Sequence, residues 1–211
     1  MNKEEVLTKI ANLKNSQFGS VSLKCKFCDL SYELILLTRD KKDDEELISL
    51  ISRWRRENQF WFSAIFNVTD EGTKKWYLSG LIDVPDRLLF IIRVAGEYIG
   101  HVGLFRFDFD NKSCEIDNIM RGERKYPGVI GNAIENLQKW GKQELGIGKY
   151  LLQTFSINEK ALKLYKKIGY KELGRDPLIC VERLDRIEWI SSSEKSDNPV
   201  YRYNVRMELI E

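Results

Sequence analysis

The segment 158–170 constrains the fold of this chain more than any other stretch. It reads N-E-K-A-L-K-L-Y-K-K-I-G-Y and follows an apolar run at 150–155 that has the length of a buried strand. Asn158 is a typical helix N-cap and Gly169 a typical helix stop, so the pattern predicts a helix between them. Asn158 and Tyr165 lie about two helical turns apart, so both side chains can face one cleft. It is equally open that Asn158 is only a helix cap and that Tyr165 only fills the core.

The rest of the chain predicts a mixed α/β domain. Helical spacing is expected at 3–13, 43–56, 70–78 and 129–145, and strands are expected at 20–27, 32–38, 88–94, 98–107, 113–120, 150–155, 170–173 and 201–210. This order favours a sheet with helices packed on it. We expect an extension of one helix and one strand at 1–30, and a main domain at 31–211 with a long polar connection at 176–200.

Composition and charge exclude several classes of protein. The 211 residues are enough for one domain with a sizeable core, and the net charge of +2 is too balanced for an electrostatic nucleic-acid binder. No apolar run approaches the roughly 20 residues of a membrane-spanning helix, and the first residues carry no signal-peptide pattern. We therefore expect a cytoplasmic protein that engages neither nucleic acid nor membrane.

The four cysteines favour structural thiols over a metal or redox centre. Cys25 and Cys28 form one C-x-x-C motif between strand-like flanks, while Cys114 and Cys180 stand alone. A structural zinc site normally needs four ligands, and the chain has a single histidine. A redox motif would need a strand–helix context. We expect reduced cysteines and no metal.

The segment 116–131 carries a second signal. A predicted strand leads into a loop with glycines, and the loop opens the long helix at 129–145. Free N–H groups and the positive end of a helix suit a phosphate or pyrophosphate. Arg121, Arg124 and Lys125 add positive charge there. The alternative is an ordinary loop with solvated basic residues.

Together the two segments resemble the GNAT superfamily of acyl-CoA-dependent N-acyltransferases, over residues 31–210 and most clearly over 115–170. The family's loop pattern, [R/Q]-x-x-G-x-[G/A], corresponds to K-Y-P-G-V-I from Lys125 to Ile130. Gly128 matches it, Lys125 is a conservative change, and Ile130 departs from it although Gly131 follows. The family's later pattern, N-x-x-A-x-x-x-Y and then G-[FY], is met at Asn158, Ala161, Tyr165, Gly169 and Tyr170.

The resemblance implies a mixed, mostly antiparallel sheet flanked by helices, splayed into a V between its fourth and fifth core strands. It also implies acetyl-CoA as the co-substrate. Loop amides would hold the pyrophosphate, Asn158 would contact the pantetheine arm, and Tyr165 would lie near the CoA sulfur. The residues expected at the coenzyme are Ile119, Met120, Arg121, Lys125, Gly128, Val129, Ile130, Gly131, Asn158, Ala161 and Tyr165.

Acyl transfer to an amine also needs a base, an oxyanion donor and an acid. The amine must be neutral to attack, and we rank Glu115, then Asp117, then His101 as its base. Backbone N–H groups near Ile119 and Met120 would stabilise the oxyanion, as the resemblance implies. Tyr165 suits the acid, because a phenol with a pKa near ~10 stays protonated at neutral pH.

Each candidate base has an alternative interpretation. The two carboxylates can pair with Arg106 or Arg121, and a lone strand histidine is more often structural. A base that acts only through water would leave all three dispensable.

The sequence constrains the identity of the amine acceptor less than it constrains the type of reaction. The block E-I-D-N-I-M-R-G-E, followed by P-G, resembles a bacterial GNAT subgroup linked to amino-sugar modification in surface polysaccharide synthesis. We therefore expect a small-molecule amine, a nucleotide-linked amino sugar. Aromatic residues at 60–62, with Trp76 and Tyr77, either line the acceptor cleft or fill the core.

Two alternatives stay open. One is a protein N-terminal or small-amine acetyltransferase acting on polyamines or antibiotics, and the other is a non-catalytic acyl-CoA-binding regulatory module. The N-terminal helix and the connection at 176–200 suit homodimer contacts and lids equally.

Overall fold

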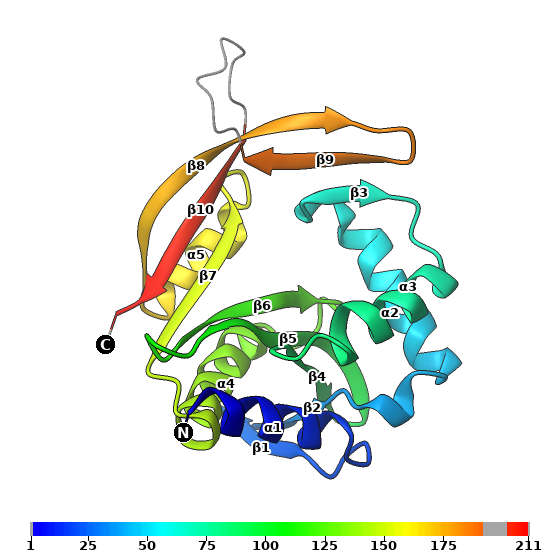
Figure 1. Cartoon of the computed structure of the whole chain (residues 1–211), viewed down its shortest axis with the longest axis vertical. Coiled ribbons are helices and arrows are strands. Elements are labelled where there is room, and N and C mark those ends of the chain that lie inside the picture. The colour runs from blue at the N-terminus through cyan, green and yellow to red at the C-terminus, as the bar shows by residue number, and fades with distance from the viewer. Residues whose placement is uncertain (1, 192–201, 211) are drawn as a thin grey trace.

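One mixed sheet carries the fold and curves strongly from β1 to β3 (Figure 1). The structure is a computed structural model that describes residues 2–191 and 202–210. Among these residues ten strands run in the order β1-β2-β4-β5-β6-β7-β10-β8-β9-β3, and β3 and β9 close the far end. The predicted mixed, mostly antiparallel sheet with flanking helices is confirmed.

The first half of the sheet is an antiparallel meander. It contains β1 (Ser22–Phe27), β2 (Leu30–Leu36), β4 (Leu88–Val94), β5 (Glu97–Asp108) and β6 (Ser113–Arg121). The two-residue turn between β1 and β2 places Cys28 at φ 51°, the backbone region that tight hairpin turns require. Nearly every side chain of β4 is buried, which explains why this strand reads as a continuous apolar run.

The sheet splits between β6 and β7 (Lys149–Phe155). These strands run parallel but pair only where Ser113–Glu115 meets Lys149–Leu151. Beyond Glu115 the two strands diverge, and β7 continues on its other side with β10 (Arg202–Leu209). The V-shaped splay that the resemblance implies is therefore present between β6 and β7.

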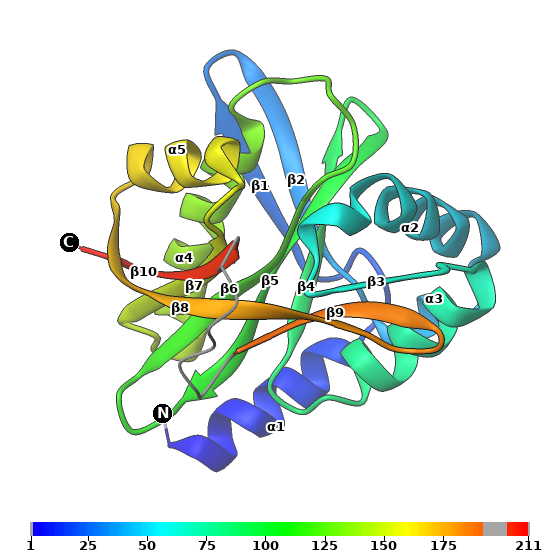
Figure 2. The same cartoon turned by 90° about the horizontal axis from the view of Figure 1, so that it is seen from above.

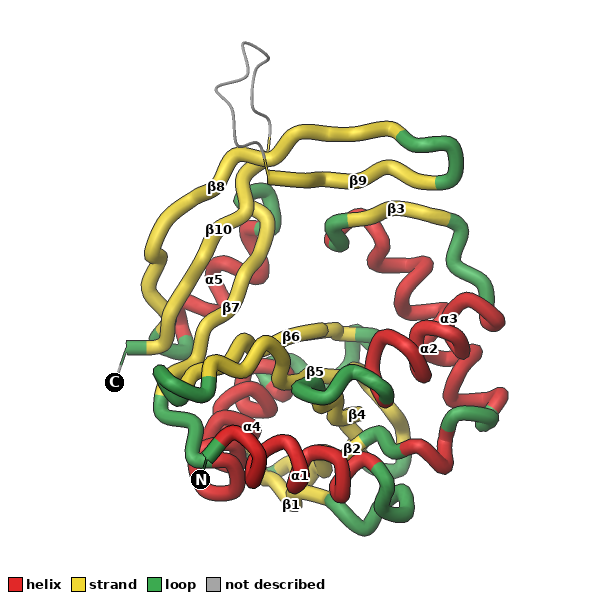
Figure 3. The backbone as a smooth tube through the Cα atoms, in the orientation of Figure 1, coloured by secondary structure: helices red, strands yellow, loops and turns green. Residues whose placement is uncertain are grey.

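Helices cover the sheet through two separate cores. The larger core includes residues of α1 (Lys3–Lys14), α4 (Val129–Leu145) and α5 (Glu159–Lys167). The smaller core includes residues of α2 (Glu45–Asn58) and of the π-helical turn Tyr77–Ile82, which continues α3 (Asp70–Trp76). Figure 3 shows these helices in red and the strands in yellow. Single 3-10 turns lie at Arg39–Lys41 and Gln59–Trp61. The helices expected at these positions are thus confirmed within a few residues.

The expected connection at 176–200 is wrong over its first part. β8 (Tyr170–Glu182) and β9 (Arg186–Ser191) form a hairpin, and β9 pairs with β3 (Ala64–Phe66). Figure 2 shows this hairpin crossing the molecule towards β3. Much of the hairpin is exposed, so it lacks the apolar alternation that identifies a strand from sequence. Its pairing with distant strands stabilises it instead, and the remainder of the connection, 192–200, lies outside the described residues.

Residues 1–30 contribute the helix α1 and the strand β1, and both pack into the larger core. Val6 and Ile10 of α1 are fully buried in the larger core, and β1 is hydrogen-bonded to β2.

All four cysteines are free thiols. Within the described part of the chain, no group of three metal-ligating side chains is placed to hold an ion, and no helix is long and apolar enough to span a bilayer.

Candidate active site

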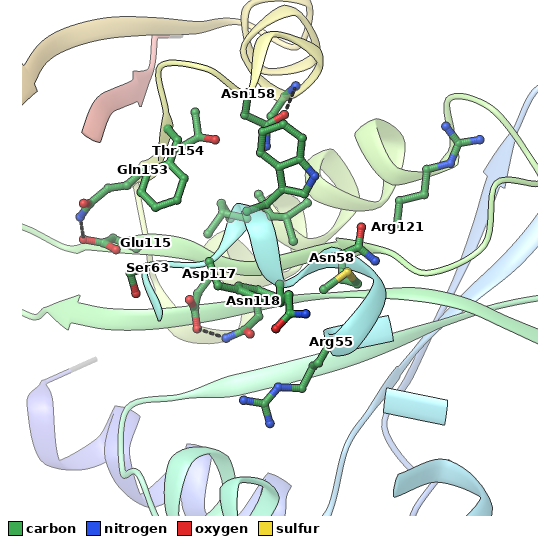
Figure 4. Close-up of a pocket in the computed structure, with 18 of the residues that line it drawn as sticks. Arg55, Asn58, Ser63, Glu115, Asp117, Asn118, Arg121, Gln153, Thr154 and Asn158 are labelled. Atoms are coloured by element: carbon green, nitrogen blue, oxygen red, sulfur yellow. Dashed lines mark hydrogen bonds between the residues drawn. The ribbon is translucent and has the colours of Figure 1, made fainter. Parts of the chain in front are cut away.

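A cavity of about 880 Å³ occupies the splay between β6 and β7 (Figure 4). Its walls come from these two strands, the start of α4, the inner face of α5, the segment from α2 to β3, and β9. This volume is typical of cavities that bind small molecules and coenzymes. The cavity brings together chain segments that are far apart in sequence.

The N-terminus of α4 is built to accept an anion. Gly128 is the N-cap, with φ 90°, and no side chain caps the helix. The N–H groups of Ile130 and Gly131 are therefore left for a ligand, whereas that of Val129 donates to the Tyr126 carbonyl at 3.4 Å. A Cβ on Gly128 would lie 2.6 Å from the Phe27 ring, so only glycine fits here. This uncapped turn fits the pyrophosphate that the sequence predicts at this loop.

The predicted loop residues divide into three groups. Gly128, Ile130 and Gly131 line the cavity. Val129 is fully buried beneath it, and Lys125 forms an ion pair with Glu97 at 2.7 Å outside the lining. Loop position alone could not separate these groups, because the turn of the helix decides which residues face inward.

Two further side chains of the segment before α4 line the cavity. Arg121 lines the cavity, and its guanidinium donates to the backbone carbonyls of Glu123 and Arg124. Tyr126 also lines the cavity, with φ 56°. No sequence pattern indicated Tyr126, because a non-glycine residue in the left-handed region has no local signature.

Asn158 and Tyr165 both line the cavity, as their helical spacing predicts. The Asn158 Oδ1 accepts from the Ala161 backbone N–H at 3.3 Å, which leaves the amide nitrogen free to donate. Ala161 lines the cavity as well. Tyr165 is only 5% exposed, and its hydroxyl has no hydrogen-bond partner among the described residues. Burial raises the pKa of Tyr165, so the phenol keeps its proton at neutral pH.

The two predicted carboxylates are held in different ways. Asp117 accepts three hydrogen bonds, all at Oδ2: from Arg87 Nε at 2.8 Å, Arg87 Nη2 at 2.5 Å and Asn118 Nδ2 at 2.7 Å. Its Oδ1 has no protein partner in the described structure. Glu115 is engaged at both oxygens, by Arg106 at 3.3 and 3.2 Å and by Gln153 at 2.7 Å. The Asp117 carboxylate is therefore held in one orientation through Oδ2, while Oδ1 remains available as an acceptor.

His101 does not reach the cavity. It is 2% exposed, packs against Trp54 with ring centroids 6.1 Å apart, and is absent from the lining. Its Nδ1 lies 2.7 Å from the carbonyl of Asn118, so this nitrogen carries the proton. Burial lowers the pKa of His101 to about 4. The structure gives no support to His101 as a base, because the imidazole is buried in the core and does not line the cavity.

The backbone of β6 is irregular where an oxyanion donor is expected. Its pairing with β5 shifts register between His101 and Gly103, opposite Asn118 and Ile119. Asn118 has φ 47°, and Ile119 and Met120 both line the cavity. A bulge of this kind redirects backbone groups next to a site.

The aromatic segment divides between cleft and core. Trp61, Phe62 and Trp76 line the cavity. Phe60 is half exposed, and Tyr77 is buried and donates to the Thr38 carbonyl at 2.8 Å. Both interpretations of this aromatic set are therefore correct for part of it.

Several lining residues were not among the site residues expected from the sequence. They come from elements whose contribution depends on tertiary closure: Arg55, Asn58, Arg87, Gln153, Thr154, Trp189 and Asn204. Trp189 lies in β9, which was expected to be a connection. Its ring packs 4.0 Å from the guanidinium of buried Arg202, which ties the hairpin to β10.

Comparison with known proteins agrees with this geometry. The model of the acetyltransferase (GNAT) domain matches residues 34–171, more than half of the 211-residue chain. No curated protein matches the sequence significantly.

Solved structures share the fold at low sequence identity. Spermidine N-acetyltransferase from Vibrio cholerae in complex with CoA and spermine has 20% identity and a TM-score of 0.63, covering 84% of this chain and 94% of that chain. The same enzyme with manganese ions gives 18% identity and a TM-score of 0.58, with 84% and 91% covered. Its dodecameric intermediate-state structure gives 19% identity and a TM-score of 0.57, with 85% and 93% covered.

The domain match and the shared fold agree with the coenzyme-sized cavity at the split sheet. The chain belongs to the GNAT acetyltransferase family and is an acyl-CoA-dependent N-acetyltransferase.

Proposed function

We propose that this enzyme transfers an acetyl group from acetyl-CoA to the primary amine of a small molecule, by direct attack on the thioester. One observation carries the proposal: the uncapped start of α4 at Gly128, the Asn158 amide and the Tyr165 hydroxyl all open into the same cavity. A pyrophosphate, a pantetheine amide and a thiol occur in this order along CoA. The three groups suit them in turn.

In the proposed reaction the neutral amine nitrogen attacks the thioester carbonyl carbon. A C–N bond forms, and the oxygen gains charge that backbone N–H groups near Ile119 and Met120 stabilise. The C–S bond then breaks, and the CoA thiolate takes the proton of Tyr165. The amine gives up one proton to a base, and solvent returns one to the phenolate.

For the base, the contacts favour Asp117 over Glu115. Three donors fix Asp117 through Oδ2, so Oδ1 remains as an oriented acceptor for the amine or for a bridging water. Glu115 has no such free oxygen, because Arg106 and Gln153 occupy both. This reverses the order expected from sequence.

The enclosure of the cavity favours a small acceptor over a protein. The segment Ala64–Phe66 pairs with β9, and Ala64, Phe66, Trp189 and Ser191 all line the cavity, so this strand pair forms one of its walls. A protein substrate needs an open groove for its backbone. Among small amines, the solved structures named above are spermidine enzymes, so the small-amine alternative has more support than the nucleotide-linked amino sugar.

The proposal is tested in two steps. Calorimetry first measures binding of acetyl-CoA, and a thiol-release assay then compares polyamines, nucleotide-linked amino sugars, simple amines and peptides as acceptors. We expect coenzyme binding and turnover with a small amine only. Turnover confined to peptides would refute the acceptor class, and coenzyme binding without any turnover would favour a regulatory module.

A further inference from the structure

The acceptor side of the cavity contains a guanidinium with no anionic partner. Arg55 of α2 is half-buried and lines the cavity. Its Cζ lies over the Trp76 ring at 4.5 Å and over the Phe66 ring at 5.7 Å, and both rings line the cavity too. No carboxylate or carbonyl of the described residues accepts a hydrogen bond from it. Stacking on rings leaves the in-plane N–H donors of a guanidinium free.

The charge of the cavity lining is strongly unbalanced. The cationic side chains are Arg55, Arg87, Arg106, Arg121 and Lys160, against the carboxylates Glu115 and Asp117. Arg106 and Arg87 already pair with these two carboxylates. Each carboxylate of the lining within the described residues therefore already has an arginine partner, which disfavours a polycation, whereas a ligand anion would supply the opposite charge that the half-buried Arg55 lacks.

Arg55 is also separate from the coenzyme end. Arg121 and Lys160 lie with the loop and α5, near the proposed pyrophosphate and pantetheine positions. Arg55 stands at the opposite end of the cavity from Asn158 (Figure 4). Its side chain neighbours Arg87, which holds Asp117, the proposed base. An anion bound by Arg55 would thus belong to the acceptor.

We propose that the acceptor amine carries an oxyanion, a carboxylate or a phosphate, and that Arg55 binds it through paired N–H donors. This rests on the proposed N-acetyltransferase function and adds the substrate class. Planar carboxylates and phosphates match the fork of a guanidinium, and such charge-assisted pairs are among the strongest hydrogen bonds. Burial and the neighbouring Arg87 lower the pKa of Arg55, but a guanidinium stays charged, so the site persists across the working pH range.

The first test measures oxyanion binding without turnover. Protein saturated with CoA, so that its pyrophosphate site is filled, is titrated at constant ionic strength with inorganic phosphate or succinate, and the melting temperature is followed. Arg55→Gln is compared with Arg56→Gln, because Arg56 is the adjacent arginine of α2, pairs with Asp70 and lies outside the lining. We expect a saturable rise for the wild type and Arg56→Gln, and none for Arg55→Gln. Equal rises in all three proteins, or no rise in the wild type, would overturn the proposal.

The second test separates the two oxyanions by turnover. Glucosamine 6-phosphate is compared with glucosamine, γ-aminobutyrate with its amide, and both pairs with spermidine. We expect the charged member of one pair to exceed its neutral partner in kcat/KM by at least about tenfold, and the ratio to collapse in Arg55→Gln. Spermidine as the preferred acceptor would refute the inference. Oxyanion binding through Arg55 with no acetylation of any amine would instead refute the proposed function.

Discussion

Replacing Tyr165 by phenylalanine separates catalysis from folding unusually well in this enzyme. The hydroxyl lies in the cavity wall and has no hydrogen-bond partner among the described residues. Its removal therefore leaves no buried donor or acceptor unsatisfied in the protein. The ring keeps its packing in the larger core, including the tilted contact with Tyr170 at 6.3 Å between centroids. We expect Tyr165→Phe to fold as well as the wild type, within about 0.5 kcal/mol.

The kinetic effect should be much larger than the effect on stability. If Tyr165 donates to the departing thiolate, the variant loses one hydrogen bond to a charged group, worth about 1.5–3 kcal/mol in the transition state. Because about 1.4 kcal/mol is tenfold in rate, kcat should fall by roughly 10- to 150-fold. The coenzyme affinity should change little, since the thioester sulfur carries no charge before bond cleavage.

Three measurements on the purified variant check this reasoning. Thiol release under saturating acetyl-CoA gives kcat, calorimetry gives the affinity for CoA, and urea unfolding gives the free energy of unfolding. Tyr77→Phe is the contrasting variant, because the Tyr77 hydroxyl donates to the Thr38 carbonyl at 2.8 Å in the smaller core. It should lose stability by about 1 kcal/mol and keep its kcat. An unchanged kcat in Tyr165→Phe would refute the assignment of the acid.

Three further predictions concern the carboxylates, the loop and pH. Asp117→Asn should lower kcat by about 10²-fold or more, and Glu115→Gln by only a few-fold, in the same thiol-release assay; the reverse order would restore Glu115 as the base. Gly128→Ala should weaken CoA binding and cost about 1–2 kcal/mol of stability through its φ of 90°, whereas Gly148→Ala, with open space around it, should do neither in calorimetry and urea unfolding. The pKa of His101 is about 4 in the folded protein, below its ordinary 6.5. Between these two pH values the unfolded chain binds a proton at His101 that the folded chain does not. The free energy of unfolding should therefore fall by up to about 3 kcal/mol as the pH drops from about 6.5 to 4. A His101→Gln variant with the same pH slope in urea unfolding would contradict this.

The local elements of the site were predictable because each has a short-range cause. Asn158 caps α5 by accepting from Ala161, and the helix that this cap starts brings Tyr165 to the cavity two turns later. Gly128 and Gly146 flank α4 with left-handed backbone, as the helix stop and start signals indicate. Such caps and periodicities depend on residues a few positions apart, so the sequence alone reveals them.

The acceptor side was not predictable in the same way. β9 is half exposed and pairs with β3, a segment more than a hundred residues earlier in the chain, so its strand character comes from partners rather than from its own pattern. The position of Arg55 in the lining depends on how α2 packs beside α3. The free Oδ1 of Asp117 depends on Arg87, which reaches Oδ2 from just before β4. His101 has the right chemistry, but packing against Trp54 keeps it out of the cavity.

The sequence by itself determined the elements of the proposed coenzyme site: a loop that opens a helix at Gly128, and a strand–helix unit that brings Asn158 and Tyr165 to the cavity. Both follow from hydrogen bonds and side-chain spacing within single elements. Only the tertiary structure decided the proposed acceptor side, where β9 and β3 pair and line the cavity and Arg55 has no carboxylate partner, because Arg87 and Arg106 pair with Asp117 and Glu115. The physical reason is that charge pairing and enclosure are set by distant segments meeting, which no local pattern encodes.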